Sequence, residues 1–118
     1  MCLTKIHRLP KISNKPITVY KTLIPLYEDH FQTPYQSCKV CIGDTIKARE
    51  AWWKGIFKER IEGEGVHAHT NVVSAKGDYF VRYGSDIIVE AEIPPYTPYW
   101  VGRMGDIASS KMKIIKML

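Results

Sequence analysis

Two carboxylates stand in the most regular apolar segment of this sequence. Glu90 and Glu92 lie two residues apart within residues 86–93, where acidic and apolar side chains alternate. Residues two apart share one face of a β-strand. Two carboxylates on one face can act as general acid and general base when one of them is buried, but acids that alternate with isoleucine and valine are more typical of the solvated side of a sheet. Glu90 and Glu92 are therefore catalytic candidates, and we favour the solvated interpretation.

His67 is the third catalytic candidate. It follows Gly63 and Gly65, which predict a sharp turn of the backbone. A histidine beside such a turn can be aimed into a cavity and can transfer protons. A hydrogen-bonded structural histidine is the more common case, and we favour it here.

A CxxC motif raises the question of a metal site. Cys38 and Cys41 form the motif, and His67 and His69 follow downstream. Two thiolates and two imidazoles suit a tetrahedral zinc ion. Their spacing differs from that of standard zinc fingers, so we expect no metal and no other cofactor, with these four residues as the zinc alternative. The three cysteines are expected to be free thiols.

Aromatic side chains could provide a binding surface. Tyr96, Tyr99 and Trp100 stand among prolines, where exposure is plausible, and Tyr20 lies in a predicted strand. Exposed rings of this kind can stack on bases or sugars. The aromatics of residues 52–57 recur at helical spacing and are more typical of a core.

The charge of the chain is modestly positive. The 17 lysine and arginine residues exceed the 12 acidic residues, giving a formal charge of +5. Many basic residues lie near the two ends of the sequence: Lys5, Arg8, Lys11, Lys15, Lys111, Lys113 and Lys116. They would form one basic patch if the ends met in space, but we favour solvated ends. No apolar run reaches the roughly 20 residues of a membrane span, and no signal peptide is recognised, so a cytoplasmic protein without membrane contact is expected.

The elements that must position these residues are mostly strands. Residues 17–24, 36–42, 86–93, 98–101 and 111–118 are expected to be extended, with a loop over residues 25–35 and a turn over 102–106. The apolar phase of the last strand shifts between Ile114 and Ile115, which indicates a bulge or burial on both faces.

Two segments allow a helix. The spacing of apolar residues predicts an amphipathic helix over residues 47–61, begun by Asp44 or Thr45, or alternatively a hairpin that turns at Gly55. Asn71 either caps a short helix or precedes a hairpin that turns at residues 77–78. The prediction is one α+β domain over residues 17–118, a compact and mostly antiparallel sheet with one or two helices, after an irregular lead-in over residues 1–16.

The second half resembles a group of small proteins of unassigned role from bacteriophages and gut Bacteroidetes. The likeness rests on four segments in order: Gly65-Val-His-Ala68, which is similar to a G-F-H-A turn, then Ile88 to Pro95, Tyr99 to Gly102, and Gly105 to Met112. Val66 replaces the phenylalanine of that turn. The resemblance implies a compact β-rich fold and a phage or bacterial source, here Bacteroides, and it carries no activity.

A second likeness concerns the strand of Glu90 and Glu92. Glu90-Ala-Glu92 followed by Ile-Pro-Pro-Tyr is similar to the E-x-E strand of mono-ADP-ribosyltransferases. That resemblance implies that Glu92 would hold the ribose hydroxyl of NAD and that Glu90 would select the acceptor. Tyr20-Lys21 stands where that family has an arginine or a histidine in its opening strand, and no Ser-Thr-Ser strand follows.

Three functions remain as hypotheses from the sequence. The first is a small non-enzymatic module of phage or mobile-element origin that binds a macromolecule, a protein in preference to nucleic acid. The second is a reduced ADP-ribosyltransferase-like enzyme that uses Glu92, Glu90 and His67. The third is a basic module that binds nucleic acid.

Overall fold

The chain folds mainly into antiparallel strands, as its alternating apolar segments predict. A computed structural model of the protein describes residues 3–4, 9–33, 39–48, 60–61, 66–76 and 87–118. In chain order the strands are β1 (Leu3–Thr4), β2 (Ile17–Tyr27), β3 (His30–Gln32), β4 (Lys39–Cys41), β5 (Thr45–Lys47), β6 (Arg60–Ile61), β7 (Val66–His69), β8 (Ile87–Ile93), β9 (Tyr99–Val101), β10 (Asp106–Ser109) and β11 (Lys111–Met117).

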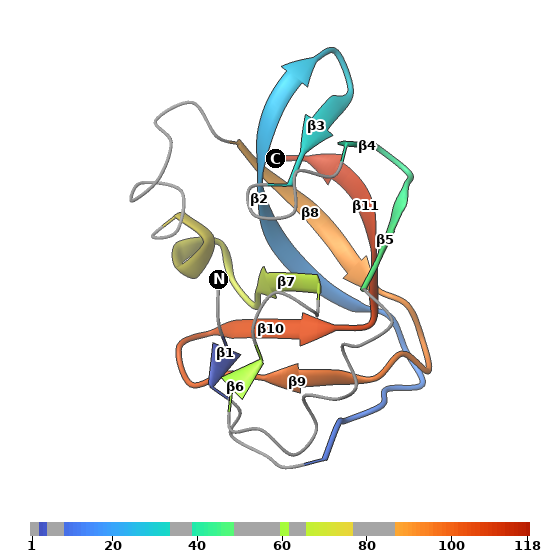
Figure 1. The fold of residues 1–118 in the computed structure, drawn as a ribbon, viewed down its shortest axis with the longest axis vertical. Helices are drawn as coiled ribbons and strands as arrows, with labels where there is room; N and C mark the ends of the chain where they lie inside the picture. The colour runs from blue at the N-terminus through green and yellow to red at the C-terminus, as the bar shows by residue number, and fades with distance from the viewer. Residues whose placement is uncertain (1–2, 5–8, 34–38, 49–59, 62–65, 77–86) are drawn as a thin grey trace.

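One large sheet contains most of these strands. Its order is β5-β11-β8-β2-β7-β10-β9, and β3 and β4 continue it from the far end of β2. β2, β8 and β11 lie side by side, while β7, β10 and β9 run across their direction (Figure 1). The two halves are joined where Tyr20 of β2 pairs with His69 of β7. β1 and β6 form a separate two-stranded sheet, so the N-terminal lead-in contributes a short strand.

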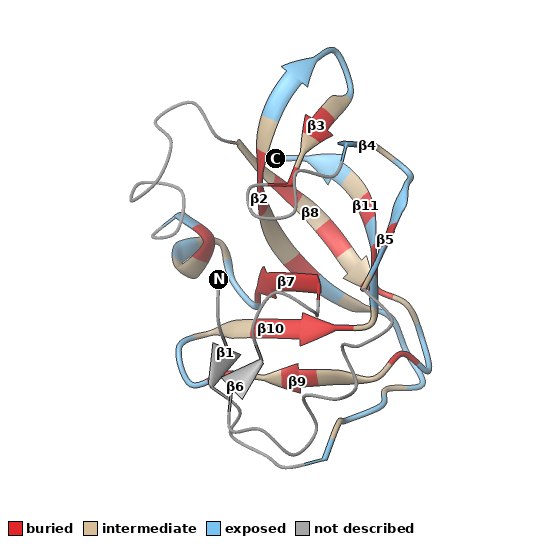
Figure 2. Cartoon of the chain, viewed as in Figure 1, coloured by how far each residue is buried: buried red, intermediate tan, exposed pale blue. Residues whose placement is uncertain are grey.

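The core lies on one face of β2, β8 and β11. Val19, Ala91 and Ile114 are register partners across these strands, and all three are fully buried (Figure 2). Ile107 of β10 and Ala68 of β7 belong to the same cluster, so both halves of the sheet share one core. Burial of this apolar surface is the main force that holds the two halves together.

A short helix accompanies the sheet. Residues 72–76 are helical, and the Asn71 side chain accepts a hydrogen bond from the Ser74 N–H at 2.8 Å. This is the N-cap geometry that asparagine favours. The cap predicted for Asn71 is confirmed; residues 77–86, which include the alternative hairpin turn, lie outside the described residues. In the part of the chain that the structure describes, no helix has the length and apolarity of a membrane span.

The predicted loop over residues 25–35 is wrong for residues 25–27 and 30–32, which belong to strands. β2 continues through Pro25 to Tyr27, and β3 pairs with it. Within the described residues, the pairing of β2 with β8 ends at Leu23 and Ile87, and Pro25 pairs with Phe31 of β3. A proline has no N–H to donate, so Pro25 offers only its carbonyl to a neighbouring strand. The strand predicted over residues 36–42 is β4, Lys39–Cys41, and residues 34–38 lie outside the described part.

The helix predicted over residues 47–61 is wrong at both ends. Lys47 belongs to β5, and Arg60 and Ile61 form β6. Ile46 is buried opposite Met112 of β11, and its neighbours Thr45 and Lys47 are exposed, which is the alternation of a strand. Asp44 does not cap a helix: its carboxylate accepts the Cys41 N–H at 2.8 Å in the turn between β4 and β5. Residues 49–59 lie outside the described residues.

The last strand behaves as its sequence predicts. The register between β11 and β8 shifts between Ile114 and Lys116, so the expected bulge is confirmed. Ile114 is buried and Ile115 is half-buried. The bulge puts Lys116 opposite Glu90 after Lys113 has been placed opposite Glu92.

Candidate functional site

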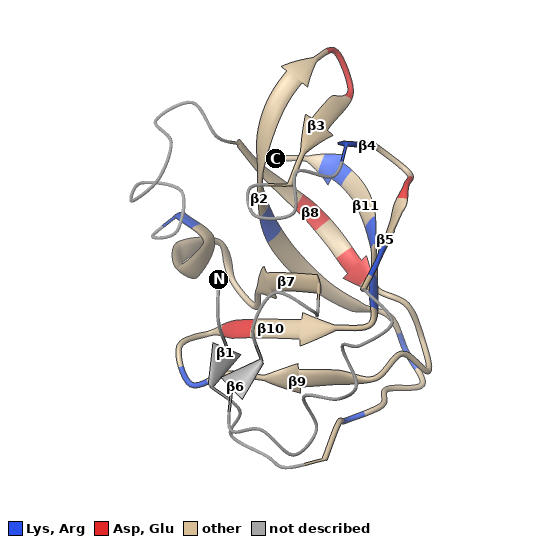
Figure 3. Ribbon diagram, viewed as in Figure 1, with Lys and Arg blue, Asp and Glu red and all other residues tan. Residues whose placement is uncertain are grey.

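Glu90 and Glu92 lie on the face of β8 that points away from Val89 and Ala91. Glu90 is the register partner of Tyr20 on β2 and of Lys116 on β11. Glu92 is the partner of Thr18 and of Lys113 on the same two strands. Both residues are half-buried, and Figure 3 marks the acidic positions of β8 in red along the ribbon. Each therefore has a lysine on one side and a hydroxyl-bearing residue on the other.

The row that begins at Lys116 and Glu90 crosses the junction of the two half-sheets. Tyr20 pairs with His69 of β7, and His69 pairs with Asp106 of β10. Directly opposite residues of antiparallel strands share a face. One row of polar side chains thus spans five strands, and it contains Glu90 and Tyr20 from the sequence-based candidates, with His69 in place of His67.

His67 lies outside this row. Its register partner is Ala108, and its side chain is buried. Its carbonyl accepts a hydrogen bond from the Lys21 ammonium group at 2.6 Å. The structure therefore does not bring His67 into register with Glu90 or Glu92, the arrangement that joint acid–base chemistry would use.

His69 is tied to the short helix. Its Nδ1 lies 2.8 Å from Ser74 Oγ, and that hydroxyl donates to the Met104 carbonyl at 3.2 Å. A serine hydroxyl has one proton. When that proton goes to Met104, His69 Nδ1 is the donor to Ser74. The Asp106 carboxylate accepts a hydrogen bond from the Met104 N–H at 3.2 Å, a contact within the turn between β9 and β10. This arrangement fixes the helix to the β9–β10 turn.

The candidate zinc ligands lie on different strands of the sheet. Cys41 is on β4 with His30 as its register partner, whereas His67 and His69 are on β7. Cys38 lies outside the described residues. Among the residues that are described, no three histidine, cysteine or acidic side chains form a group that would hold a metal ion.

The aromatic candidates have different environments. Trp100 is 1% exposed and packs in the interior, so it is a core residue and not an exposed stacking platform. Alternation along β9 explains this, because Tyr99 and Val101 on either side are only half-buried. Tyr96, in contrast, is 73% exposed and has a backbone φ of 61°.

Tyr96 lies where the lead-in meets the loop between β8 and β9. Its N–H donates to the Ser13 carbonyl at 2.7 Å. Lys11 and Tyr99 exchange two backbone hydrogen bonds, of 2.9 and 3.0 Å. The segment that carries Lys11 and Lys15 therefore runs beside this loop.

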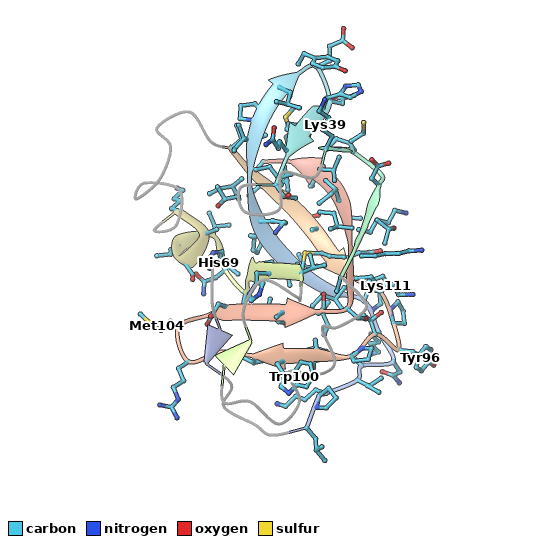
Figure 4. All side chains as sticks on the ribbon, viewed as in Figure 1. Lys39, His69, Tyr96, Trp100, Met104 and Lys111 are labelled. Carbon is cyan, nitrogen blue, oxygen red and sulfur yellow. The ribbon has the colours of Figure 1, made fainter. Side chains whose placement is uncertain are left out.

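The same loop contacts the start of β11. The Ser110 N–H donates to the Pro98 carbonyl at 3.2 Å, and the Ala48 N–H donates to the Ser110 carbonyl at 2.8 Å. Lys111 follows Ser110 and Lys47 precedes Ala48, so both lie next to these bonds. Figure 4 shows Lys111 and Tyr96 on the same side of the molecule.

We refer to Lys11, Lys15, Lys47, Lys111 and Tyr96 as the lysine corner. All five residues are exposed. Figure 3 marks lysines on the lead-in, on β5 and at the start of β11. The lysine corner is formed by four segments, residues 11–15, 45–48, 94–99 and 109–111. These segments together contain four lysines and no acidic residue. Residues 11–15 and the start of β11 thus both bond to the loop between β8 and β9, and their lysines are solvent-exposed, as expected for the basic ends of the sequence.

Lys47 and Lys111 stand directly opposite each other on β5 and β11. The bond from Ala48 to Ser110 makes the next pair a hydrogen-bonded one, so Lys47 and Lys111 form a non-hydrogen-bonded pair. Side chains come closest in pairs of this type, and like charges opposite each other destabilise a sheet. An anion placed between these two ammonium groups would relieve that repulsion.

Reasoning from the sequence missed Lys47. The apolar spacing of residues 52–61 dominates that segment and predicts a helix that starts at residue 47. The signal that identifies it is shorter: Thr45-Ile46-Lys47 alternates directly after the turn at Gly43-Asp44. That alternation predicts an edge strand with outward-facing polar side chains.

Comparison of the chain with protein-family models, with curated proteins and with solved structures gives no match.

Proposed function

We propose that this protein is a small binding module that contacts nucleic acid through the lysine corner and performs no covalent chemistry. The observation that carries the proposal is the convergence of Lys11, Lys15, Lys47 and Lys111 around one loop, from three separate parts of the sequence. Lysine and arginine residues clustered on one part of a surface are the electrostatic signature of nucleic-acid binding.

The same features favour nucleic acid over the protein partner expected from the sequence. A protein-binding surface around residues 96–100 would need a contiguous apolar patch. Of that segment only Tyr96 is prominently exposed, since Trp100 is buried and Tyr99 is half-buried. The lysines around Tyr96 are better matched to phosphates than to an apolar partner.

The strand pairing around Glu90, Glu92 and His67 supports an ADP-ribosyltransferase-like enzyme less than it supports a binding module. Such an enzyme would use Glu90, Glu92 and His67 together. Glu90 lies beside Tyr20, but Glu92 lies beside Thr18, and His67 is opposite Ala108. The two glutamates also face lysines on β11, which suits a charged sheet surface.

Salt dependence tests the proposal. A labelled oligonucleotide of about 16 nucleotides is titrated with the 118-residue chain between about 50 mM and about 200 mM salt, and fluorescence anisotropy reports binding. Four phosphate contacts on a single strand predict a slope of about −3 for log K against log salt concentration. Absence of binding at the lowest salt concentration would overturn the proposal.

A charge-matched pair of variants localises the site. Lys47→Gln with Lys111→Gln removes two positive charges from the lysine corner, and Lys39→Gln with Lys76→Gln removes two exposed charges elsewhere. The first variant should weaken binding about tenfold or more and reduce the salt slope by about 1.4. The second should change affinity less than about threefold, because its lysines contact no phosphate. Equal losses in both would show that only net charge matters.

A further inference from the structure

We infer that the lysine corner selects single-stranded nucleic acid, with an unpaired base stacked on the Tyr96 ring and the adjoining phosphates on Lys47 and Lys111. This inference rests on the proposed function. It adds the form of the ligand and the residue that recognises it.

The backbone at Tyr96 is the first reason. A φ of 61° lies in the left-handed region, which a bulky non-glycine residue rarely adopts. Glycine or asparagine would fit this conformation at lower cost. The tyrosine side chain is 73% exposed, so core packing does not compensate for that cost. Strained residues of this kind cluster at ligand-binding positions, where the strain fixes a side chain in place.

The loop around Tyr96 is the second reason. Pro94 and Pro95 precede it and Pro98 follows it, which restricts the backbone on both sides. The bond to Ser13 holds its N–H, and the neighbouring Thr97 is 1% exposed. The ring is therefore presented from a fixed loop, and binding loses less conformational entropy than it would on a mobile one.

The combination of ring and charge defines the ligand. Proteins that bind single strands use positive charge for the phosphates and exposed aromatic rings for the bases. The faces of bases in a duplex are covered by their neighbours, so a ring gains access only when a base is unpaired or flipped out. The paired lysines Lys47 and Lys111 supply the phosphate contact, and Figure 4 shows Lys111 on the same side of the molecule as this ring. A rigid exposed tyrosine adds affinity for a single strand and almost none for a duplex.

The test compares single-stranded and duplex oligonucleotides of the same sequence. Affinities are measured for the natural chain, Tyr96→Phe and Tyr96→Ala, and a 2-aminopurine base in the single strand reports stacking through its fluorescence. Tyr96→Phe should retain single-strand affinity within about twofold, because the ring face remains. Tyr96→Ala should lose about tenfold and should abolish the fluorescence change, with duplex affinity unchanged. Thermal unfolding of each variant confirms that it is folded.

The outcomes separate this inference from the proposed function. If neither oligonucleotide binds the natural chain, the proposed function fails and this inference fails with it. If both bind equally and Tyr96→Ala changes neither, the lysine corner binds nucleic acid but Tyr96 does not read a base, and this inference alone is overturned. If an acidic peptide of equal charge competes as well as the single strand and produces the same dependence on Tyr96, the partner is a protein and the inference is also overturned.

Discussion

The N–H of Tyr96 donates a hydrogen bond of 2.7 Å to the carbonyl of Ser13, and this bond joins the N-terminal lead-in to the loop between β8 and β9. The two residues are far apart in the sequence. Their contact brings Lys11 and Lys15 beside a loop that also bonds to the start of β11. A strained backbone at Tyr96 thus coincides with the point where three basic segments meet.

Replacement of Tyr96 by glycine should separate stability from binding. Glycine adopts a φ of 61° without steric cost, whereas an L-residue with a side chain loses roughly 1–2 kcal/mol there. Glycine also makes the unfolded chain more flexible, which offsets up to about 1 kcal/mol of that gain. The expected result is a free energy of unfolding that rises by about 0–1 kcal/mol, measured with urea, together with weaker binding of single strands. A loss of more than about 1 kcal/mol would show that the tyrosine ring stabilises the fold.

A side chain at Gly102 is expected to displace the Asp106 carboxylate. A Cβ atom at this position would overlap the carboxylate of Asp106, whose Oδ1 accepts the Met104 N–H at 3.2 Å. Gly102→Ala should therefore lower the free energy of unfolding by about 1–3 kcal/mol, as overpacking does. Asp106→Ala removes the overlapping atoms, so the double variant should lose less than the sum of the two single losses. Strict additivity in urea unfolding would contradict this close approach.

Trp100 should matter for stability and not for surface binding. The side chain is 1% exposed, and truncation of such a large buried ring costs about 3–5 kcal/mol. Trp100→Ala should lower the unfolding midpoint strongly in a denaturant titration. Met104→Ala removes a side chain that is 85% exposed and should change stability by less than about 0.5 kcal/mol. A small effect of Trp100→Ala would mean that its ring is not part of the core.

The strands were predictable where alternation is regular. Residues 86–93 predict β8, because their apolar side chains occupy one face and the two glutamates the other. The bulge in β11 follows from the change of phase at Ile114. In both cases one strand's own pattern contains the information, and the prediction of a mostly antiparallel sheet with a short helix is confirmed.

The candidate site was less predictable because it depends on pairing between distant segments. Tyr96 was singled out from its neighbouring prolines, but nothing within residues 94–99 indicates that Ser13 or Ser110 lies beside them. The helical spacing of the aromatic residues that follow Lys47 predicts a helix at that position. The short strand β5 forms by pairing with β11, where Ile46 lies opposite Met112 and is buried. Register, and with it the facing lysines, is a tertiary property.

Glu92 provides a test that distinguishes binding from enzymatic hypotheses. It faces Lys113 on the strand that begins with Lys111, so its carboxylate lowers the positive potential next to the lysine corner. Glu92→Gln keeps the shape of the side chain and removes this charge. Single-strand affinity should rise about twofold at low salt, and the gain should shrink as salt screens the charge. Glu28→Gln, on the exposed tip between β2 and β3, makes the same charge change away from the corner and should leave affinity unaltered. An ADP-ribosyltransferase-like enzyme predicts a different result, in which the natural chain binds NAD in a calorimetric titration and Glu92→Gln abolishes that binding.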